Sequence, residues 1–511
     1  MKLNKDIQLN KLLNVLVFSS FIVFIWIFLS KLLTYFYRIV IARYFGPEQY
    51  GLFSLAGMIF ILFVHLISFG LPEGLVRYIS IYRGKRQYKN IKEILGKSFL
   101  ILVFVGILGG LIMFFLSSWI SLNIFHEEKL VIFVKIASLA IPFFVISNLY
   151  LSVLRSFERV GWYSFILNFV QNSSKLLSLI ILIFFGLVDN TLMISYTIGI
   201  IIMFFFSYFV VSVKIKIPEG KRDPLKKGVM RELISYSWPL SLLGIVSFTL
   251  YWVDSFSIGY FQNVTAVGFY NAAVPIAALL MLAPDLIIQL FFPLVTKQYS
   301  ENNHSLIEQL SKQVNKWIFL INLPLAAIFI LFPGTILNFL FGSEYLVAEN
   351  ALRLLAFGSL FGSLSIVPAH LISMTGKSKK ILSINIFMLI LNFVLNFILV
   401  PRYGISGAAF STMIIFLLLS SILIYETKRS LDFVPLRRKM LLALIASFIP
   451  LLLISSIKYF VTLNFLWIFV AGLVYILAYI ALIFFLGCLD KHDFELINSF
   501  VKKRFVKKVK S

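Results

Sequence analysis

Cysteine is almost absent from this chain: its 511 residues include one, Cys488. A single thiol excludes an intramolecular disulfide framework and any cluster of thiolate ligands. The chain also lacks a P-loop or another Gly-rich phosphate cradle, which excludes ATP hydrolysis by the chain alone. No His/Cys/Asp constellation for a metal and no Ser-His-Asp set occurs on any loop, so we expect no metal site, no catalytic residue and no bound cofactor.

Charged residues are also scarce, at 13% of the chain against about 25% in an ordinary soluble protein. Hydrophobic residues make up 60%, and the mean hydropathy is +0.96. A soluble domain needs more polar surface than this, so composition predicts a chain embedded in lipid. The net charge of +24 does not indicate nucleic-acid binding, because the basic residues lie in short loops between apolar runs and not on a soluble basic face.

The apolar runs predict an all-α polytopic membrane protein with about 14 transmembrane helices. A hydrocarbon core of about 30 Å needs about 20 apolar residues per helix. The first run has no small-residue cleavage site and is interpreted as a retained span, not a signal peptide. The predicted spans are 14–43, 50–71, 95–118, 130–152, 164–187, 190–213, 233–259, 265–292, 312–333, 348–373, 381–400, 405–426, 440–458 and 464–487.

Basic residues in the loops predict the orientation. With the N-terminus inside, the Lys- and Arg-rich segments 72–93, 214–231, 374–380, 427–440 and the tail after 487 all fall on one side. The opposite side receives only Arg43, Lys129, Arg402 and Lys458. Cytoplasmic loops carry an excess of Lys and Arg, so we expect a multi-pass protein of the cell membrane with both termini in the cytoplasm.

An internal repeat divides the spans into two sets of six, followed by two more. At an offset of 216, Lys31, Tyr35, Arg38, Tyr44 and Phe45 fall on Ser247, Tyr251, Asp254, Tyr260 and Phe261, and Gly51 then falls on Gly268 after one inserted residue. Six spans is an even number, so the two copies are expected to run in parallel. The predicted parts are an N-lobe (1–213), a cytoplasmic linker (214–232), a C-lobe (233–426), two extra helices (427–487) and a basic tail (488–511).

Charged residues at bilayer depth are the candidate site, because each is costly to insert. Lys31, Tyr35 and Arg38 share one face of the first span, and Arg with tyrosine suits a pyrophosphate carrying sugars. Snorkelling of Arg38 to the headgroups is the alternative. Lys175, beside the polar cluster 171–174, is expected to line a cavity.

Tyr251 and Asp254 form the equivalent stripe in the second copy. Asp254 pairs with Arg38 in one access state, forms a permanent structural pair, or binds a proton or Na⁺; the sequence leaves these open. Asp285, which follows Pro284, is a further ion-site candidate, with a proline kink near the inner surface as the alternative. Arg353 either contributes to a gate or marks the end of its span.

The segment Ala42–Phe53 resembles the AR-x-x-G-x-x-x-Y-G motif that ends the first span of polysaccharide flippases, within the multidrug/oligosaccharidyl-lipid/polysaccharide exporter superfamily. The plan of six, six and two spans and the basic turn 375–378 fit the same family. The resemblance implies two lobes around a central cavity that alternates its access, and a groove for a lipid tail between the extra helices. The implied substrate is a polyprenyl-pyrophosphate oligosaccharide used for surface polysaccharide assembly.

Three other functions are weighed against this one. A flippase for the peptidoglycan lipid precursor would show similar cations, and the sequence separates it poorly from the first function. A multidrug exporter of the same fold needs an acidic cavity for cationic drugs, whereas the first lobe presents Lys31, Arg38 and Lys175. A membrane glycosyltransferase or polysaccharide polymerase needs a sizeable outer loop, and every outer loop here is short. We therefore expect no enzyme, with transport driven by H⁺ or Na⁺, membrane potential or product consumption. The expected partners are membrane lipids, the lipid-linked oligosaccharide and glycan-assembly proteins, with the chain itself a monomer.

Overall fold

Every regular element in the described part of the chain is helical. The structure is a computed structural model, and it describes residues 2–187, 190–218, 228–457 and 465–489. The chain contacts group into two compact units, residues 1–272 with 385–408 and residues 273–384 with 409–511. The predicted lobe boundaries concern sequence repeats and not contacts, and they stay a prediction.

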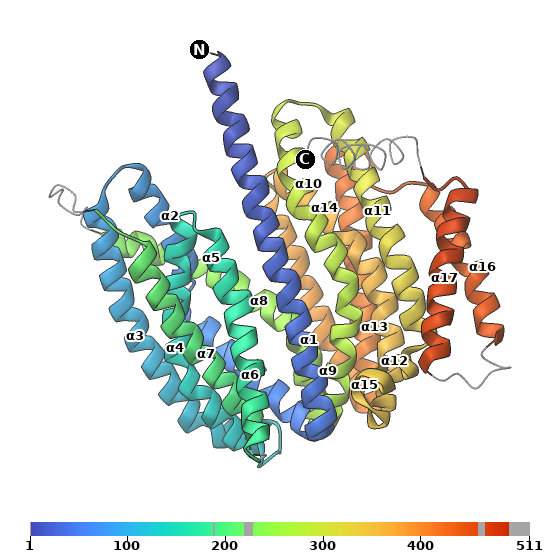
Figure 1. Cartoon of the computed structure of the whole chain (residues 1–511), viewed down its shortest axis with the longest axis horizontal. Helices are drawn as coiled ribbons and strands as arrows, with labels where there is room; N and C mark the ends of the chain where they lie inside the picture. Colours follow the sequence, from blue (N-terminus) through green and yellow to red (C-terminus); the bar gives the residue numbers. More distant parts are fainter. Residues whose placement is uncertain (1, 188–189, 219–227, 458–464, 490–511) are drawn as a thin grey trace, which may run out of the picture. The chain divides into compact units, whose positions relative to one another are not determined.

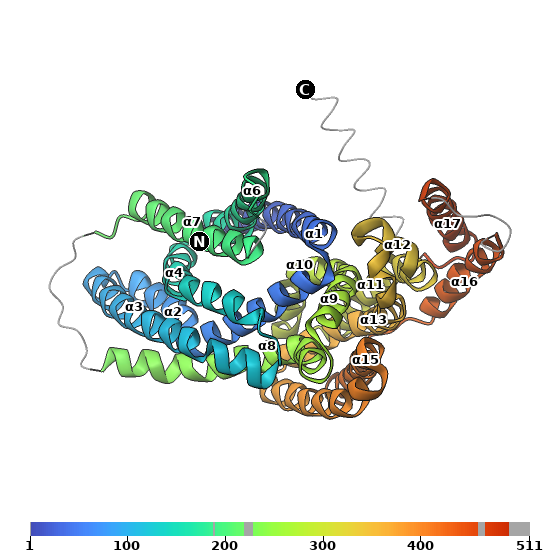
Figure 2. The same cartoon turned by 90° about the horizontal axis from the view of Figure 1, so that it is seen from below.

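In the first unit, α3 packs on α4, and α7 packs on both α4 and α6 (Figures 1 and 2). The long helix α1 contacts α4, α8 and the segment α5–η2–α6. Its elements are α1 (Lys2–Ser68), α2 (Leu71–Gly84), α3 (Tyr88–Trp119), η1 (Ile120–Ile124), α4 (Leu130–Ser156), α5 (Val160–Ser164), η2 (Phe165–Val170), α6 (Gln171–Phe184), α7 (Thr191–Lys214), α8 (Val229–Phe261), the start of α9 (Val264–Ala278) and the middle of α15 (Ser378–Leu431).

In the second unit, α11 packs on α10, α13 and α16, and α16 packs on α17. The α16–α17 pair is held to α11 by Tyr479, whose hydroxyl donates to the carbonyl of Leu320 at 3.0 Å. The elements are η3 (Leu279–Met281), α10 (Leu282–Ser300), α11 (His304–Leu331), α12 (Pro333–Phe341), η4 (Ser343–Ala348), α13 (Glu349–Gly362), η5 (Ser363–Ser365), α14 (Ile366–Met374), the two ends of α15, α16 (Lys439–Ile457) and α17 (Phe465–Phe485).

The described helices accommodate the fourteen predicted spans. Ten of the described helical segments are long and apolar enough to cross a membrane. Two of these ten hold two predicted spans each, because α1 breaks at Gly46 (φ 78°) and α15 at Gly404 (φ 57°), backbone angles that suit glycine. The shorter apolar helices α16 and α17 hold the last two. The prediction of an all-α polytopic membrane protein is confirmed.

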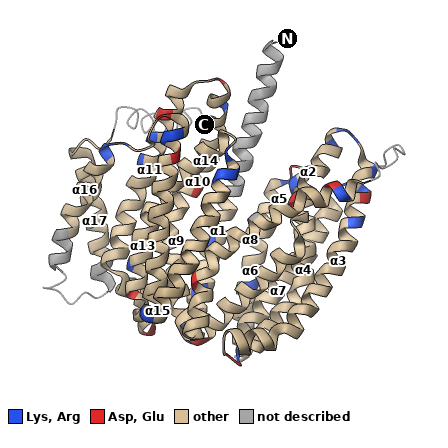
Figure 3. Ribbon diagram, turned by 180° about the vertical axis from the view of Figure 1, so that it is seen from behind, with Lys and Arg blue, Asp and Glu red and all other residues tan. Residues whose placement is uncertain are grey.

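Side-chain exposure fits the same conclusion. Large apolar side chains such as Phe115, Phe184 and Phe485 stand exposed on the described helices, as lipid-facing residues do. Figure 3 shows Lys, Arg, Asp and Glu gathered mostly at helix ends, with the middles of the helices largely free of them. The chain is therefore a multi-pass membrane protein.

The predicted repeat has a counterpart in the backbone. Left-handed residues occur in the turns at Arg86, His126, Glu158 and Gly186 of the first copy. The turns of the second copy have them at Asn302, Gly342, Gly376 and Gly404, which lie 216, 216, 218 and 218 residues later. Positive φ is uncommon outside glycine, so its recurrence at nearly constant spacing indicates that the turns themselves repeat.

The aligned glycines Gly51 and Gly268 meet each other's helices. A Cβ atom on Gly51 would lie 1.9 Å from the carbonyl oxygen of Val264, and one on Gly268 would lie 1.9 Å from that of Pro47. Only glycine permits backbones to approach so closely. The contact is reciprocal, because each glycine faces the residue four positions before the other, as expected for two related helices crossing.

Helices also occupy segments that were predicted to be loops or that lie beyond the predicted spans. Segment 72–93, interpreted as a loop, contains α2 and the first turns of α3, and helices α10 and α11 continue past the predicted spans 265–292 and 312–333. Leu71, Leu75 and Ile79 are buried along one side of α2, spaced by four residues. The polar residues between them hide this helix from a search for uniformly apolar runs.

Candidate functional site

The rotation of α1 is fixed by a polar face that packs on α6 and α7. Asn172 donates to Ser30 Oγ at 2.8 Å and accepts from Thr34 Oγ1 at 3.2 Å. One turn further, the buried hydroxyl of Tyr37 lies 3.1 Å from Ser195 Oγ. Ser30, Thr34 and Tyr37 recur at helical spacing, so these bonds hold a single face of α1 against its neighbours.

The predicted stripe Lys31, Tyr35 and Arg38 therefore lies on the adjoining face of α1. Lys31 is exposed, whereas Tyr35 and Arg38 are partly buried. Tyr251, on α8, is 58% exposed and lies near Arg38, as Tyr35 does. The structure thus brings Tyr35, Arg38 and Tyr251 together, while the side chain of Lys31 is left outside the packed interface.

Arg38 donates to a backbone carbonyl that lacks its usual partner within the helix because of a proline. Its Nη1 donates to Tyr50 Oη at 3.1 Å and to the carbonyl of Asn271 at 3.4 Å, and Tyr50 Oη donates to the same carbonyl at 2.9 Å. Within α9 that carbonyl would normally bond the N–H of residue 275. Residue 275 is proline, which has no N–H, so the carbonyl is left for Arg38 and Tyr50.

Lys175 of α6 adds a second cation near Arg38. Its Nζ lies 5.0 Å from the centre of the Tyr37 ring, a cation–π contact. Its charge and that of Arg38 repel each other, and neither side chain has an acidic partner among the described residues. Gly199 of α7 packs against Lys175 so closely that a Cβ there would lie 2.8 Å from that of Lys175. Two uncompensated cations in membrane-spanning helices favour an anionic ligand.

Asp254 of α8 sits in a buried network of amides and hydroxyls. Tyr270 Oη donates to Asp254 Oδ2 at 2.6 Å, and Asn396 Nδ2 donates to Oδ1 at 2.8 Å. Asn396 Nδ2 also contacts Asn392 Oδ1 at 3.0 Å. These neutral donors stabilise a carboxylate in an apolar region.

Arg38 and Asp254 form no ion pair in the described contacts, but their networks meet on α9. Tyr270 binds Asp254, and the next residue, Asn271, binds Arg38 through its carbonyl and Ser255 through its Nδ2 at 3.0 Å. A shift of α9 would disturb both networks at once. Pairing of Arg38 with Asp254 in another access state stays a prediction.

The other two predicted residues belong to the second unit. Arg353 binds locally: it pairs with Glu349, donates to Asn350 Oδ1 at 2.8 Å and donates to the carbonyl of Ile330 at 3.2 Å. This set of partners ties α13 to the end of α11, a structural role. Asp285 is exposed on α10, and a role of either residue in a gate or an ion site stays a prediction. No group of three or more His, Cys, Asp or Glu side chains suited to a metal occurs in the described residues.

Four polar partners in this site were missed by sequence reasoning: Tyr50, Tyr270, Asn271 and Asn396. Each is neutral, so a search for charges at bilayer depth passes over it. One available signal was the pair Asn392 and Asn396, which lie four residues apart in an apolar run. Hydrogen-bonding amides spaced this way in a span mark a face that avoids lipid.

The family follows from the comparison with known proteins. The model of the family described as "Polysaccharide biosynthesis protein" matches residues 16–299, more than half of the chain. The chain belongs to the polysaccharide biosynthesis protein family. This confirms the resemblance noted at residues 42–53. The MatE model also matches residues 239–398, so this member of the family shares sequence features with a second family of the exporter superfamily.

Relatives of this family member extend over most of its length. It is 25% identical over 502 residues to an uncharacterized membrane protein of Methanocaldococcus jannaschii, covering 93% of this chain and 96% of the other. It is 24% identical to a putative O-antigen transporter of Shigella flexneri, covering 73% and 88%. A probable low-salt glycan biosynthesis flippase of Haloferax volcanii is 26% identical, covering 53% and 56%.

Solved structures show the fold. An inward closed lipid II flippase superposes with a TM-score of 0.73 at 18% identity, covering 90% of this chain and 97% of that one. An inward-facing multidrug exporter superposes with a TM-score of 0.67 at 14% identity, covering 79% and 94%. The chain therefore has the fold that these two transporters share.

Proposed function

We propose that this chain is a flippase that moves a polyprenyl-pyrophosphate oligosaccharide across the cytoplasmic membrane by alternating access. The observation that carries this function is the pair of uncompensated cations, Arg38 and Lys175, in membrane-spanning helices beside Tyr35 and Tyr251. A pyrophosphate supplies the missing negative charge, Arg binds phosphate oxygens in a fork, and tyrosine rings contact sugars. The names of the Shigella and Haloferax relatives support the same substrate class.

The multidrug-exporter alternative is supported by the MatE match and by the shared fold. The local charge argues against it, because organic cations would meet Arg38 and Lys175 and be repelled. The Shigella relative is named as a putative transporter and the Haloferax relative as a probable flippase, which supports transport over catalysis. We propose that the chain acts as a monomer, beside the proteins that assemble the glycan.

Removing the positive charge of Arg38 or of Lys175 tests whether these residues bind an anionic substrate. Purified chain in liposomes is given a fluorescently tagged undecaprenyl-pyrophosphate oligosaccharide, and translocation is followed by quenching from outside. Arg38→Ala and Lys175→Ala should each slow translocation about 10- to 150-fold, the loss of one hydrogen bond to a charged group. Arg38→Lys and Lys175→Arg keep the charge and should retain more activity than the alanine variants.

The same liposomes separate the two transport functions. A dye cation such as ethidium serves as the drug substrate. Ethidium transport by the wild-type chain, together with unchanged glycan-lipid translocation in Arg38→Ala, would contradict the flippase assignment. Lys89→Ala, an exposed cation at the start of α3, is the control for loss of positive charge alone.

We also propose that Asp254 binds the coupling cation, H⁺ or Na⁺. Asn396 Nδ2 donates both to this carboxylate and to Asn392 Oδ1, and Asn396 Oδ1 is buried with no hydrogen-bond partner among the described residues. Carboxylate and amide oxygens are the donors that hard cations prefer. This set fits Na⁺, and it fits a proton at the carboxylate equally well.

Asp254→Asn keeps the size of the side chain and removes its negative charge. In liposomes with an imposed Na⁺ or H⁺ gradient, we expect translocation by the variant to lose its dependence on the gradient. Glu93→Gln, which removes a half-buried carboxylate that pairs with Lys97 on α3, should keep that dependence. Full gradient dependence in Asp254→Asn would rule out coupling at this residue.

A further inference from the structure

A basic cavity opens at one end of the first unit, away from the cations of the candidate site. Three separate parts of the chain meet there: the α2–α3 turn, the α4–α5 turn and the end of α7. The cavity has a volume of about 760 Å³. Its charged lining residues are Arg83, Arg86, Glu158, Arg159, Lys214 and Lys216.

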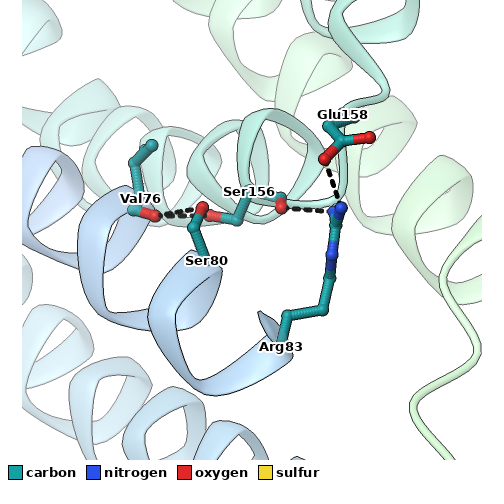
Figure 4. A network of polar contacts seen from close by, with 5 residues as sticks. All are labelled: Val76, Ser80, Arg83, Ser156 and Glu158. Atoms are coloured by element: carbon teal, nitrogen blue, oxygen red, sulfur yellow. Dashed lines mark hydrogen bonds and ion pairs between the residues drawn. The ribbon is translucent and has the colours of Figure 1, made fainter. Parts of the chain in front are cut away.

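Arg83 lines one side of this cavity and pairs with Glu158, the acidic residue in the described lining. Its guanidinium donates to the carbonyl of Ser156 at 2.7 Å, pairs with Glu158 and lies 5.6 Å from the centre of the Phe157 ring (Figure 4). The Oγ of Ser156 in turn lies 3.4 Å from the carbonyl of Val76 on α2. These bonds tie α2 to the turn after α4 and fix one side of the cavity.

Four cations remain without a carboxylate partner among the described residues: Arg86, Arg159, Lys214 and Lys216. Glu158 is the one acid in the described lining, and Arg83 already occupies it. The preference for basic residues in inner loops explains why Lys and Arg occur in these segments. It does not explain why four of them, from three turns, converge on one concave surface with a single acid that is already paired.

Apolar and aromatic groups border the cations. Lys214 Nζ lies 5.8 Å from the centre of the Trp162 ring, and Tyr88, Phe157 and Ile215 contribute to the lining. The apolar span of α7 ends at Lys214, so the cavity lies where that span meets water. Tryptophan and tyrosine are typical of this level of a membrane protein.

We propose that this basic cavity binds a phosphate-bearing anion at the membrane surface. Phosphate oxygens match Arg and Lys donors, and several are needed to balance four cations in one cavity. The phosphate comes either from the headgroup of an anionic phospholipid or from a soluble diphosphate. Basic clusters next to membrane-spanning helices recognise anionic headgroups by this chemistry.

Thermal unfolding of the purified full-length chain in neutral detergent tests the cavity with three probes: dioctanoyl phosphatidylglycerol, inorganic diphosphate and, as the neutral control, dioctanoyl phosphatidylcholine. The cavity variant is Arg86→Ala/Arg159→Ala/Lys216→Ala, which keeps Arg83 in place. The matched control, Lys89→Ala/Lys92→Ala/Lys379→Ala, removes the same charge from exposed residues outside the cavity. Each cation removed from the cavity should weaken binding about fivefold.

Stabilisation by phosphatidylglycerol alone identifies a lipid headgroup, and stabilisation by diphosphate identifies a soluble ligand; both support the proposal if the cavity variant loses the shift and the matched control keeps it. No shift with either anion, or equal loss in both triple variants, overturns it. Arg38→Ala separates this cavity from the candidate substrate site. A diphosphate shift that disappears in Arg38→Ala and survives in the cavity variant also overturns the proposal.

Discussion

At the scale of single residues, the position of Arg38 depends on a hydroxyl 12 residues further along the chain. Tyr50 is almost fully buried, accepts from Arg38 and donates to the Asn271 carbonyl that Pro275 leaves open. The guanidinium is thus oriented by neutral groups and keeps its full positive charge for a ligand. Most of the remaining guanidinium N–H groups have no protein acceptor in the described contacts.

Tyr50→Phe tests this arrangement by removing the hydroxyl and keeping the ring. Two hydrogen bonds are lost, which should lower the free energy of unfolding by about 1–3 kcal/mol and slow glycan-lipid translocation, since Arg38 loses its orientation but not its charge. Translocation in liposomes and thermal unfolding measure the two effects. Tyr44→Phe, at an exposed ring, is the control. A translocation rate equal to the wild type in Tyr50→Phe would mean that Tyr50 does not position Arg38.

The charged members of the site were predictable from sequence, and their partners were not. Lys175 and Arg38 stand out because charge is costly at bilayer depth. Asn271 does not, since its side chain is neutral and its role lies in a backbone carbonyl 233 residues away from Arg38. The consequence of Pro275 is local and readable, but which side chain uses the freed carbonyl depends on how α9 meets α1, which no spacing in the sequence specifies.

At the scale of elements, the crossing of α1 and α9 rests on two glycines. Gly51 and Gly268 each face a backbone carbonyl at a distance that no side chain permits. This crossing also sets the distance between Arg38 on α1 and the Asn271 carbonyl on α9. The sequence alignment of the two glycines predicted their equivalence, whereas their mutual contact appeared only in the structure.

Gly51→Leu and Gly268→Leu are expected to disrupt this crossing. The added atoms overlap backbone, which cannot move aside as a flexible side chain can, so a loss beyond the usual 1–3 kcal/mol for overpacking is expected. Size-exclusion chromatography of a fluorescent fusion should show little monodisperse protein. Gly57→Leu is the matched control on the same helix, because nothing lies within 4 Å of a Cβ there. Normal profiles for Gly51→Leu would show that the helices separate without cost.

At the scale of the whole molecule, loop charge and helix count together predict an orientation. Segments 72–93 and 293–311 are separated by an even number of predicted spans and therefore lie on the same side of the membrane. Segments 119–129 and 334–347 are likewise separated by an even number of spans and lie together on the other side. The structure supplies the helices in that order, including the breaks at Gly46 and Gly404 that turn two long helices into four spans. Helix order alone is the same for either orientation, so the side that faces the cytoplasm rests on the basic residues.

Cysteine labelling decides that orientation. In a Cys488→Ser background, which removes the buried native thiol, Glu128→Cys and Ser305→Cys each place one thiol at an exposed position, in the turn before α4 and at the start of α11. Because the basic ends are expected inside, a membrane-impermeant maleimide should label Glu128→Cys in intact cells and Ser305→Cys only after permeabilisation. As the control, the two variants should be expressed at equal levels and labelled equally after the cells are permeabilised. Labelling of Ser305→Cys in intact cells, with Glu128→Cys protected, would reverse the proposed topology and place the basic cavity on the outer surface.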